Sequence, residues 1–412
     1  MTKLSRFGGG RGRHALAAAA MTAFTLGPAH AQDPLELGAL MPMTGDLQAY
    51  GESSLSGIEL AAQEINAAGG VRGQDLAIRV GDSQTRPQSG TDAAQRLISI
   101  EGVEGIVGGL SSGVTIPVAQ SVTSEEGIPQ ISPASTSPVI TGLDDNDFLF
   151  RTVPSDAFQG RALAEIVDAK GFDTVSALYI NNDYGEGLAE SFREAFEETG
   201  GSIAASLAYE SGNASYRGEL ARAADGGAEA LVLIGYPENG VTILRQALEG
   251  GHFREFVFTD GMKAPEIIDA IGAEYLNGSA GTAAQAQTDT DAATNFRSAY
   301  EKAYGEVPPK PYIDTAYDAV YLLALAAEQA EDGGGEALRD ELRAVANPPG
   351  EVVLPGEWDK ARQLIADGQE INYEGASGAV DFDDHGDVAG TFAHWVIRDG
   401  EIVTERVFTP SR

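Results

Sequence analysis

The 412-residue chain contains no cysteine, and this absence removes several kinds of chemistry at once. Without thiols it cannot form a disulfide, hold zinc through sulfur, use a thiolate nucleophile or carry a lipid on cysteine. Histidine is scarce too: beyond the first 31 residues only His252, His385 and His394 remain, and their spacing fits no metal motif. No segment has the pattern of a phosphate-binding loop or a serine-hydrolase elbow. We therefore expect no metal, no cofactor and no enzymatic activity.

The sequence also contains few long apolar runs and few positively charged residues. The one marked apolar run, at 15–27, follows four basic residues without an acid and precedes Ala29 and Ala31, a small-x-small cleavage pattern. The run is too short to span a membrane. It predicts a signal peptide over 1–31, cleaved near Ala31, and a protein exported to the periplasm. The alternative is a basic tail on a cytoplasmic protein.

The charge that remains after removal of this leader is strongly negative. Four of the 27 lysines and arginines lie in the leader. The mature chain therefore has 62 acidic and 23 basic residues, and its formal charge is −39. Such a surface repels nucleic acid and anionic lipid, and self-repulsion favours a soluble monomer. We expect no nucleic-acid partner and no membrane insertion of the mature chain.

From Leu35 onward, short apolar runs alternate with longer amphipathic segments. Runs at 35–40, 75–82, 104–109 and 128–132 predict strands, with helices between them. This alternation is typical of a mostly parallel sheet covered by helices on both faces. After residue 156 the pattern restarts, with a helix capped by Ser155 or Asp156, so the chain should contain two similar α/β lobes.

Helical patterns at 292–330 and a predicted strand hairpin at the C-terminus follow the second α/β run. One further segment must therefore complete each lobe, and we expect the chain to cross between lobes near Val153, Thr282 and Val388. The first lobe should combine residues 32–153 with 283–388. The second should combine residues 154–282 with 389–412.

Six motifs in order resemble the periplasmic substrate-binding proteins of branched-chain amino acid ABC transporters, the leucine/isoleucine/valine type. They lie at 37–76, 105–120, 127–138, 181–192, 233–247 and 375–395. The resemblance covers essentially the whole mature chain. It implies the type I periplasmic-binding fold, in which two doubly wound lobes joined by three hinge crossovers close on a ligand.

The stretch "GGLSSGVT" at 108–115 joins a predicted strand to a predicted helix. Free backbone N–H groups at such a joint bind anions, whereas capping of the helix by Ser112 or Thr115 is the alternative. The resemblance implies that the Ser112 hydroxyl and nearby N–H groups hold a ligand carboxylate. It further implies that Thr136 adds hydroxyl and N–H donors, and that the Ala134 carbonyl faces the ligand ammonium.

The remaining candidate site residues are one carboxylate and four tyrosines. The resemblance places Tyr50 at the rim of the first lobe, stacks Tyr184 and Tyr236 of the second lobe on the ligand, and closes the side-chain pocket with Tyr312. It sets Asp260 against the ammonium, where the family often has glutamate. The shorter aspartate leaves room for a larger ligand or a bridging water. A helix-capping or turn-forming role is the alternative for Asp260.

These observations favour an extracytoplasmic solute-binding protein that delivers an amino acid-like ligand to the permease of an ABC transporter. One alternative keeps the fold but binds urea, a short amide or an aromatic acid, in which case Asp260 has no cationic partner. A ligand-sensing module is a second alternative. A secreted hydrolase is a third, although the sequence lacks a catalytic constellation for it.

Overall fold

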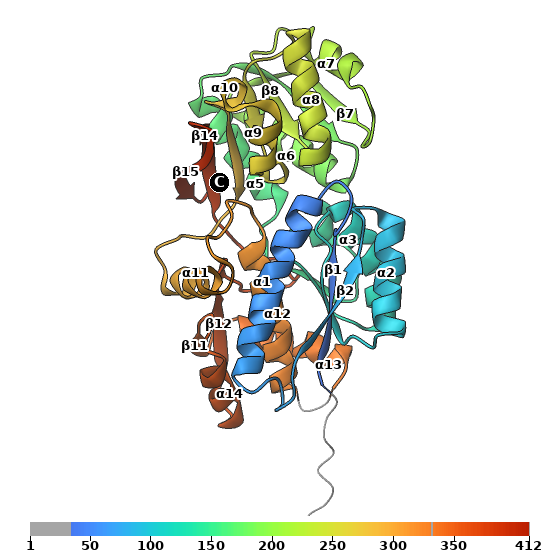
Figure 1. Cartoon of the computed structure of the whole chain (residues 1–412), viewed down its shortest axis with the longest axis vertical. Helices are drawn as coiled ribbons and strands as arrows, with labels where there is room; N and C mark the ends of the chain where they lie inside the picture. The colour runs from blue at the N-terminus through green and yellow to red at the C-terminus, as the bar shows by residue number, and fades with distance from the viewer. Residues whose placement is uncertain (1–33, 331–332, 412) are drawn as a thin grey trace, which may run out of the picture. The chain divides into compact units, whose positions relative to one another are not determined.

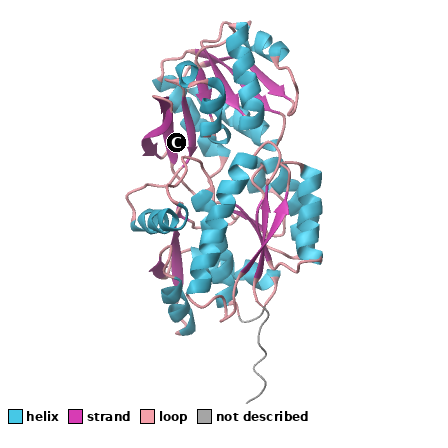
Figure 2. Ribbon diagram, in the orientation of Figure 1, coloured by secondary structure: helices cyan, strands magenta, loops and turns pink. Residues whose placement is uncertain are grey.

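A computed structural model describes residues 34–330 and 333–411, and the predicted signal peptide lies outside this range. The described chain forms two large β-sheets, each flanked by helices (Figures 1 and 2). This arrangement confirms the predicted α/β class with two lobes. We call the lobe with the five-stranded sheet the first lobe, and the lobe with the seven-stranded sheet the second lobe.

Five parallel strands form the sheet of the first lobe, in the order β2-β1-β3-β4-β5. Their bounds are β1 Glu36–Met41, β2 Ala77–Asp82, β3 Gly105–Gly108, β4 Gln130–Ser132 and β5 Leu149–Arg151. The first four strands coincide with the four apolar runs of the sequence, so those predictions are confirmed.

Helices cover both faces of this sheet (Figure 1). They are α1 Gln48–Ala67 and α12 Ile313–Gln329 on one face, with α2 Pro87–Ser99 and α3 Ser112–Val118 on the other. Alternate side chains of a strand point to opposite faces. Leu40 of β1 accordingly packs with Leu97 and Val114 of α2 and α3, whereas its neighbour Ala39 belongs to the core on the α1 and α12 side.

The helix predicted after β3 is present but irregular. Beyond α3 the chain is π-helical over Ala119–Thr123 and then α-helical in α4, Ser124–Glu126. Pro117 lies inside α3 and has no N–H to donate, so the regular bonding is interrupted there. Gly127 ends the segment with a positive φ of 69°, a conformation that favours glycine.

Seven strands form the sheet of the second lobe, in the order β15-β14-β10-β9-β8-β6-β7. Five are parallel: β6 Thr174–Ile180, β7 Ser202–Tyr209, β8 Ala230–Ile234, β9 Phe256–Phe258 and β10 Ala280–Ala284. The predicted C-terminal hairpin, β14 Phe392–Arg398 and β15 Glu401–Phe408, adds to the edge of β10 in antiparallel fashion.

The helices of the second lobe follow its strands. They are α5 Asp156–Ala169, α6 Asp183–Glu198, α7 Arg217–Ala224, α8 Pro237–Gly250, α9 Pro265–Ile271 and α10 Ala273–Leu276. Ser155, not Asp156, caps α5, because its hydroxyl accepts a hydrogen bond from the Ala157 N–H at 3.3 Å. The side chain of Asp156 is therefore available for other contacts.

The chain passes between the two sheets three times: after β5, after β10 and before β14. Between the second and third passages it returns to the first lobe with α11 Asp291–Tyr304, α12, α13 Gly335–Ala346 and α14 Trp358–Ala366. A small sheet that the sequence analysis did not predict lies there too, with β11 Glu351–Val353, β12 Ile371–Gly375 and β13 Gly378–Ala379.

A buried ion pair ties the first passage to the third. Arg151, at the end of β5, donates from Nε to Asp387 Oδ1 at 2.6 Å and from Nη2 to Oδ2 at 2.7 Å. The Arg151 side chain is fully buried, and its Nη1 also donates to the Ser137 carbonyl at 3.0 Å. Two segments 236 residues apart are thus held together beside the hinge.

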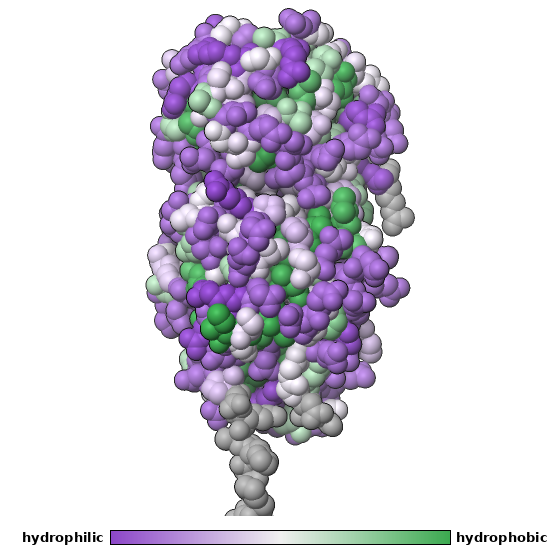
Figure 3. Space-filling model, turned by 90° about the vertical axis from the view of Figure 1, so that its right-hand side faces the viewer, coloured by the Kyte–Doolittle hydropathy of each residue, from purple (hydrophilic) through white to green (hydrophobic). Residues whose placement is uncertain are grey.

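Figure 3 shows polar residues over most of one face, with apolar residues scattered among them in small groups. None of the helices formed by residues 34–330 and 333–411 has the length and apolar character needed to cross a bilayer.

Candidate functional site

All eight residues singled out in the sequence are buried in the described structure, with side chains at most about 5% exposed. Six of them lie just beyond strand ends, and Ala134 shares the loop after β4 with Thr136. Ser112 follows β3, Thr136 follows β4, Tyr184 follows β6, Tyr236 follows β8 and Asp260 follows β9. Ligands in open α/β sheets bind outside the carboxyl ends of the strands. In both lobes, the candidate residues therefore lie at the edge formed by the carboxyl ends of the strands, where ligands are expected.

Tyr50 links the two lobes directly. It lies on α1 of the first lobe, and its hydroxyl donates to the carbonyl oxygen of Gly261 in the second lobe at 3.1 Å. Its ring meets the Tyr312 ring edge-on, with centroids 5.8 Å apart and an interplanar angle of 75°. Tyr50 is fully buried, so packing on the outer surface does not account for its position.

Ser111 makes another direct link between the lobes. Its hydroxyl is hydrogen-bonded to the Tyr236 hydroxyl at 3.0 Å, and Asn182 Nδ2 donates to the same phenol at 3.2 Å. The rings of Tyr236 and Tyr184 stack, with centroids 5.6 Å apart. Sequence reasoning selected Ser112 and missed Ser111 and Asn182. The serine pair "SS" was the signal, but which hydroxyl faces the other lobe depends on the exact turn after β3.

Neither alternative cap residue caps α3. The Ser112 hydroxyl accepts from the Ser137 N–H at 3.2 Å, and the Thr115 hydroxyl donates to the Gly109 carbonyl at 3.0 Å. Ser111 is the N-cap by position, yet its side chain makes no capping bond. The hydroxyls of "GGLSSGVT" therefore join the strand ends to one another and to the second lobe.

Asp260 is the electrostatic centre of the site. Its Oδ1 accepts from Gln159 Nε2 at 2.7 Å and from the Tyr184 hydroxyl at 2.8 Å, and the Tyr312 hydroxyl donates to Oδ2. Burial raises the pKa of Asp260, and the hydrogen bonds from Tyr312, Tyr184 and Gln159 oppose that rise. The residue begins a short 3-10 turn, Asp260–Met262, but its side chain points to these partners and does not cap the turn.

A second carboxylate, Asp156, stands next to this centre. The Thr136 hydroxyl donates to Asp156 Oδ2 at 2.8 Å, and the Asp156 N–H donates to the Thr136 carbonyl at 2.8 Å. Burial, then the negative charge of Asp260, raises the pKa of Asp156 well above its ordinary range, against the Thr136 hydrogen bond and the Arg151 charge. A hydroxyl has one proton. With that proton given to Asp156, Thr136 can offer a ligand only its N–H or the lone pairs of its oxygen.

Ala134 completes the wall that follows β4. It is buried in the loop between Ser132 and Thr136, where the Ser132 hydroxyl accepts from the Ala134 and Ser135 N–H groups at 3.4 and 3.0 Å. Ser135 in turn bonds to Thr115 at 2.7 Å between hydroxyl oxygens. This hydroxyl network fixes the loop against the start of α3.

A cavity of about 400 Å³ adjoins the site on its outer side. Ser111 and Gly113 of the first lobe line it, as do Asn182, Ser211 and Tyr236 of the second. The Ser211 hydroxyl also donates to the Asp46 carboxylate across the two lobes. The cavity therefore lies between the two lobes, beside a side-chain contact that joins them.

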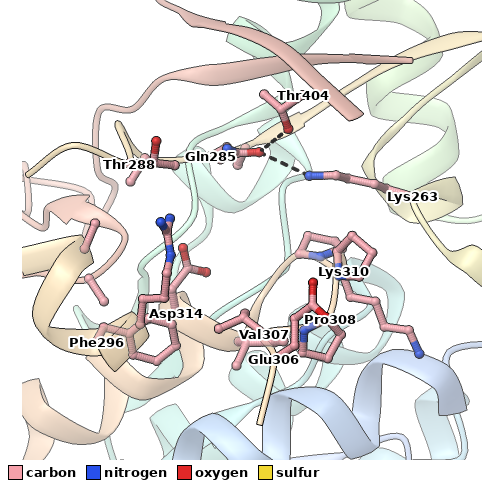
Figure 4. A pocket seen from close by; sticks show the side chains of 18 of the residues that line it. Lys263, Gln285, Thr288, Phe296, Glu306, Val307, Pro308, Lys310, Asp314 and Thr404 are labelled. Atoms are coloured by element: carbon pink, nitrogen blue, oxygen red, sulfur yellow. Dashed lines mark hydrogen bonds between the residues drawn. The ribbon is translucent and has the colours of Figure 1, made fainter. Parts of the chain in front are cut away.

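Another cavity, of about 360 Å³, lies beside the second passage between the lobes (Figure 4). Lys263 points into it and donates from Nζ to Gln285 Oε1 at 3.2 Å, and the Thr404 hydroxyl donates to the same oxygen at 3.1 Å. Burial lowers the pKa of Lys263 to about 8, against the opposing charge of Asp314. Lys263 follows the Asp260 turn directly, so this cavity and the cleft share one short segment.

Within residues 34–330 and 333–411, no three histidine, aspartate or glutamate side chains are grouped so as to hold an ion. The site is instead a set of hydroxyls, tyrosines and two carboxylates between two lobes.

Two open, mostly parallel sheets that meet at their carboxyl ends around buried polar residues define a two-lobed binding protein. A family model described as periplasmic binding protein matches residues 34–372, and the chain belongs to that family.

Individual relatives agree with this assignment. The chain is 28% identical, over 85% of its length and 84% of the relative's, to the chemotactic signal transduction system substrate-binding protein BasB of Halobacterium salinarum. Its structure is similar to the leucine-binding protein LivK of Thermotoga maritima, with a TM-score of 0.78 and 26% identity, covering 91% of this chain and 99% of that one. It is also similar to LivJ of Streptococcus pneumoniae in complex with isoleucine, with a TM-score of 0.75, 26% identity and the same coverage of both chains.

Proposed function

We propose that this protein captures a small amino acid between its two lobes and delivers it to the permease of an ABC transporter. The observation that carries the proposal is the buried Asp260 carboxylate, held by Tyr184, Tyr312 and Gln159 where the two lobes meet. A cation in this position would compensate the burial of the Asp260 charge, and an α-ammonium supplies one. The leucine- and isoleucine-binding structural relatives support the same class of ligand.

The ligand carboxylate is assigned to the first lobe. Ser112 begins α3 and Thr136 lies on the loop after β4. The Thr136 N–H is the donor we assign in place of its hydroxyl, whose proton goes to Asp156. Ala134 offers its carbonyl to the ammonium. Tyr50, Tyr184, Tyr236 and Tyr312 surround the ligand's side chain. We assign no catalytic step to the protein.

Export and assembly follow from the same proposal. We infer that residues 1–31 direct the chain to the periplasm and are removed, and that the mature protein acts as a monomer. We infer lobes of 32–153 with 283–388 and of 154–282 with 389–412, although β10, Ala280–Ala284 in the sheet of the second lobe, extends two residues past the boundary at 282. The likeness to BasB makes ligand sensing for chemotaxis a second candidate role.

A thermal-shift screen of the protein lacking residues 1–31 tests the proposal. The screen compares L-amino acids with urea, short amides and aromatic acids. A ligand that binds only the folded state raises the melting temperature in proportion to the logarithm of its concentration above Kd. We expect one or more α-amino acids to give the largest shifts. A shift with amides or aromatic acids and none with amino acids contradicts the assignment.

A further inference from the structure

The cavity beside the second passage between the lobes contains a buried ammonium group with few partners. We call this cavity, lined by Lys263, Gln285, Phe296 and Asp314 among others, the hinge cavity. Lys263 is only 6% exposed, and its Nζ donates to Gln285 Oε1 at 3.2 Å. Within residues 34–330 and 333–411 the ammonium forms no other hydrogen bond and no ion pair. Since an ammonium has three N–H donors, two of them are left to whatever occupies the cavity (Figure 4).

The surroundings of Lys263 leave its charge largely uncompensated. Gln285 is neutral, and its Oε1 is shared with the Thr404 hydroxyl, which donates to it at 3.1 Å. Asp314 acts on Lys263 only from beyond ion-pair distance. Burial raises the pKa of Asp314, against the hydrogen bond from the Thr315 N–H, so this carboxyl group carries its charge less readily than an exposed one. A buried cation without a close counter-charge is costly, and an anion in the cavity would remove that cost.

The other charged side chains that line the hinge cavity balance one another. Arg297 and Lys310 are positive, whereas Glu301 and Glu306 are negative. Lys310 already forms an ion pair with Glu266. Arg297, Glu301 and Glu306 are exposed, so water and salt screen their charges. Lys263 is therefore the buried charge that an occupant meets, and it calls for one negative charge. A second negative charge on the occupant would approach the glutamates.

The rest of the hinge cavity is suited to an apolar group. Phe296, Val307 and Ile313 of the first lobe and Ile402 of the second lobe line it, and Phe296 and Val307 lie across from Lys263 (Figure 4). Its volume of about 360 Å³ lies within the range of about 300–1,000 Å³ that is typical of small-molecule sites. Water alone could pair with the ammonium, but it gains nothing from these apolar walls.

We propose that the hinge cavity is a second binding site, for a small monocarboxylic acid whose carboxylate pairs with Lys263 Nζ and whose apolar tail packs against Phe296, Val307, Ile313 and Ile402. This proposal goes beyond the proposed function and does not depend on it. A carboxylate accepts hydrogen bonds and supplies the single negative charge that Lys263 lacks. A neutral amide of the same length supplies an oxygen without the charge. Because the walls belong to both lobes, the occupant contacts both at once.

Calorimetry of the mature protein with butyrate tests the proposal. We expect butyrate to bind at pH 8 with uptake of about half a proton, because its charge raises the pKa of Lys263 from about 8. Titrations in two buffers of different ionisation enthalpy measure this uptake, which should disappear at pH 6, where the lysine is already protonated. Butyramide, succinate and inorganic phosphate should each bind at least tenfold more weakly than butyrate.

Two variants locate the bound butyrate. Lys263→Met should weaken butyrate binding at least tenfold and abolish the proton uptake. Lys302→Met, at an exposed position of α11, is the matched control and should bind like wild type. Val307→Trp fills the cavity but keeps Lys263, so it should also lose butyrate. The melting temperature of each variant without butyrate shows whether it is folded.

Several results would overturn the proposal. Absence of butyrate binding by wild type would mean that the hinge cavity holds water only. Butyrate that binds Lys263→Met as tightly as wild type, and that the best amino acid from the screen displaces, would lie in the cleft. These outcomes are separate from failure of the proposed function. If no amino acid binds wild type but butyrate binds with Lys263-dependent proton uptake, the proposed function is wrong and the hinge cavity remains a binding site.

Discussion

Arg151 and Asp387 form a two-point ion pair, with nitrogen–oxygen distances of 2.6 and 2.7 Å, that joins two of the three passages between the lobes. Replacing Asp387 by Asn leaves a fully buried guanidinium without its counter-charge. We expect the free energy of unfolding to fall by about 3–5 kcal/mol. Urea titration followed by circular dichroism measures the change.

Thr141→Val is the matched comparison for this ion pair. It removes the Thr141 hydroxyl that bonds to both partners but keeps the ion pair itself. We expect a loss of about 1 kcal/mol from this variant. Equal losses from Asp387→Asn and Thr141→Val would show that the charge contributes nothing beyond its hydrogen bonds.

Asp260→Asn should weaken amino acid binding by about 2–5 kcal/mol, since the ligand's ammonium would enter the closed site with one counter-charge fewer. Isothermal titration calorimetry measures the loss. Asp269→Asn, at an exposed position on α9 of the same lobe, is the control and should bind like wild type. An amino acid that binds Asp260→Asn as tightly as wild type would remove Asp260 from the site.

Tyr50→Phe should shift the protein toward an open form. The change deletes only the hydroxyl that reaches the Gly261 carbonyl across the lobes. We expect ligand affinity to fall by about 0.5–1.5 kcal/mol. Small-angle scattering should show a radius of gyration that decreases with ligand in wild type and requires more ligand to decrease in the variant. Tyr275→Phe, at a tyrosine that is 54% exposed, should behave like wild type in both measurements.

Lys263→Met should stabilise the protein at neutral pH. Burial lowers the pKa of Lys263 from 10.5 to about 8, so the folded state holds the lysine proton less tightly than the unfolded state does. Between pH 8 and about 10.5 the unfolded chain binds more protons, and this group's destabilising effect disappears as the pH rises through that window. At pH 7 the effect is fully present, and we expect the variant to gain about 1–3 kcal/mol.

Thermal melts of wild type and Lys263→Met at pH 7 and at pH 10 check this sign. The difference between the two proteins should be largest at pH 7 and small at pH 10. Lys302→Met, on α11 at an exposed position, controls for the loss of one positive charge from an acidic protein. A Lys263→Met protein that is less stable at pH 7 would show that the bond to Gln285 outweighs the burial of charge.

The sequence predicted the α/β class, the main strands and the residues that gather between the lobes. These features depend on local periodicity and on motifs, both of which are readable along one segment at a time. The sheet of β11, β12 and β13 was missed because its strands are two to five residues long and carry no clear alternation.

The partners inside the site could not be predicted either. Asp156 and Ser155 are equally good capping residues in sequence, and only the fold gives the cap to Ser155 and brings Asp156 against Thr136. Ser111 and Ser112 are adjacent and chemically identical, yet one faces Tyr236 of the second lobe and the other accepts from Ser137. Such choices depend on side-chain direction after a strand end, which residue type alone does not specify.

The chain order has a consequence for how the protein can be made. α12, which covers one face of the five-stranded sheet, is synthesised only after every parallel strand of the second lobe. During synthesis from the N-terminus, the first 150 residues therefore emerge with an apolar sheet face lacking α12, while β14 and β15, at the edge of the second sheet, arrive last. The first lobe lacks α12 until residue 329 has been made, and the second lobe lacks its hairpin until residue 408 has been made. A nascent chain of this architecture therefore stays incompletely folded until these late segments have been made, with apolar sheet surface exposed in the meantime.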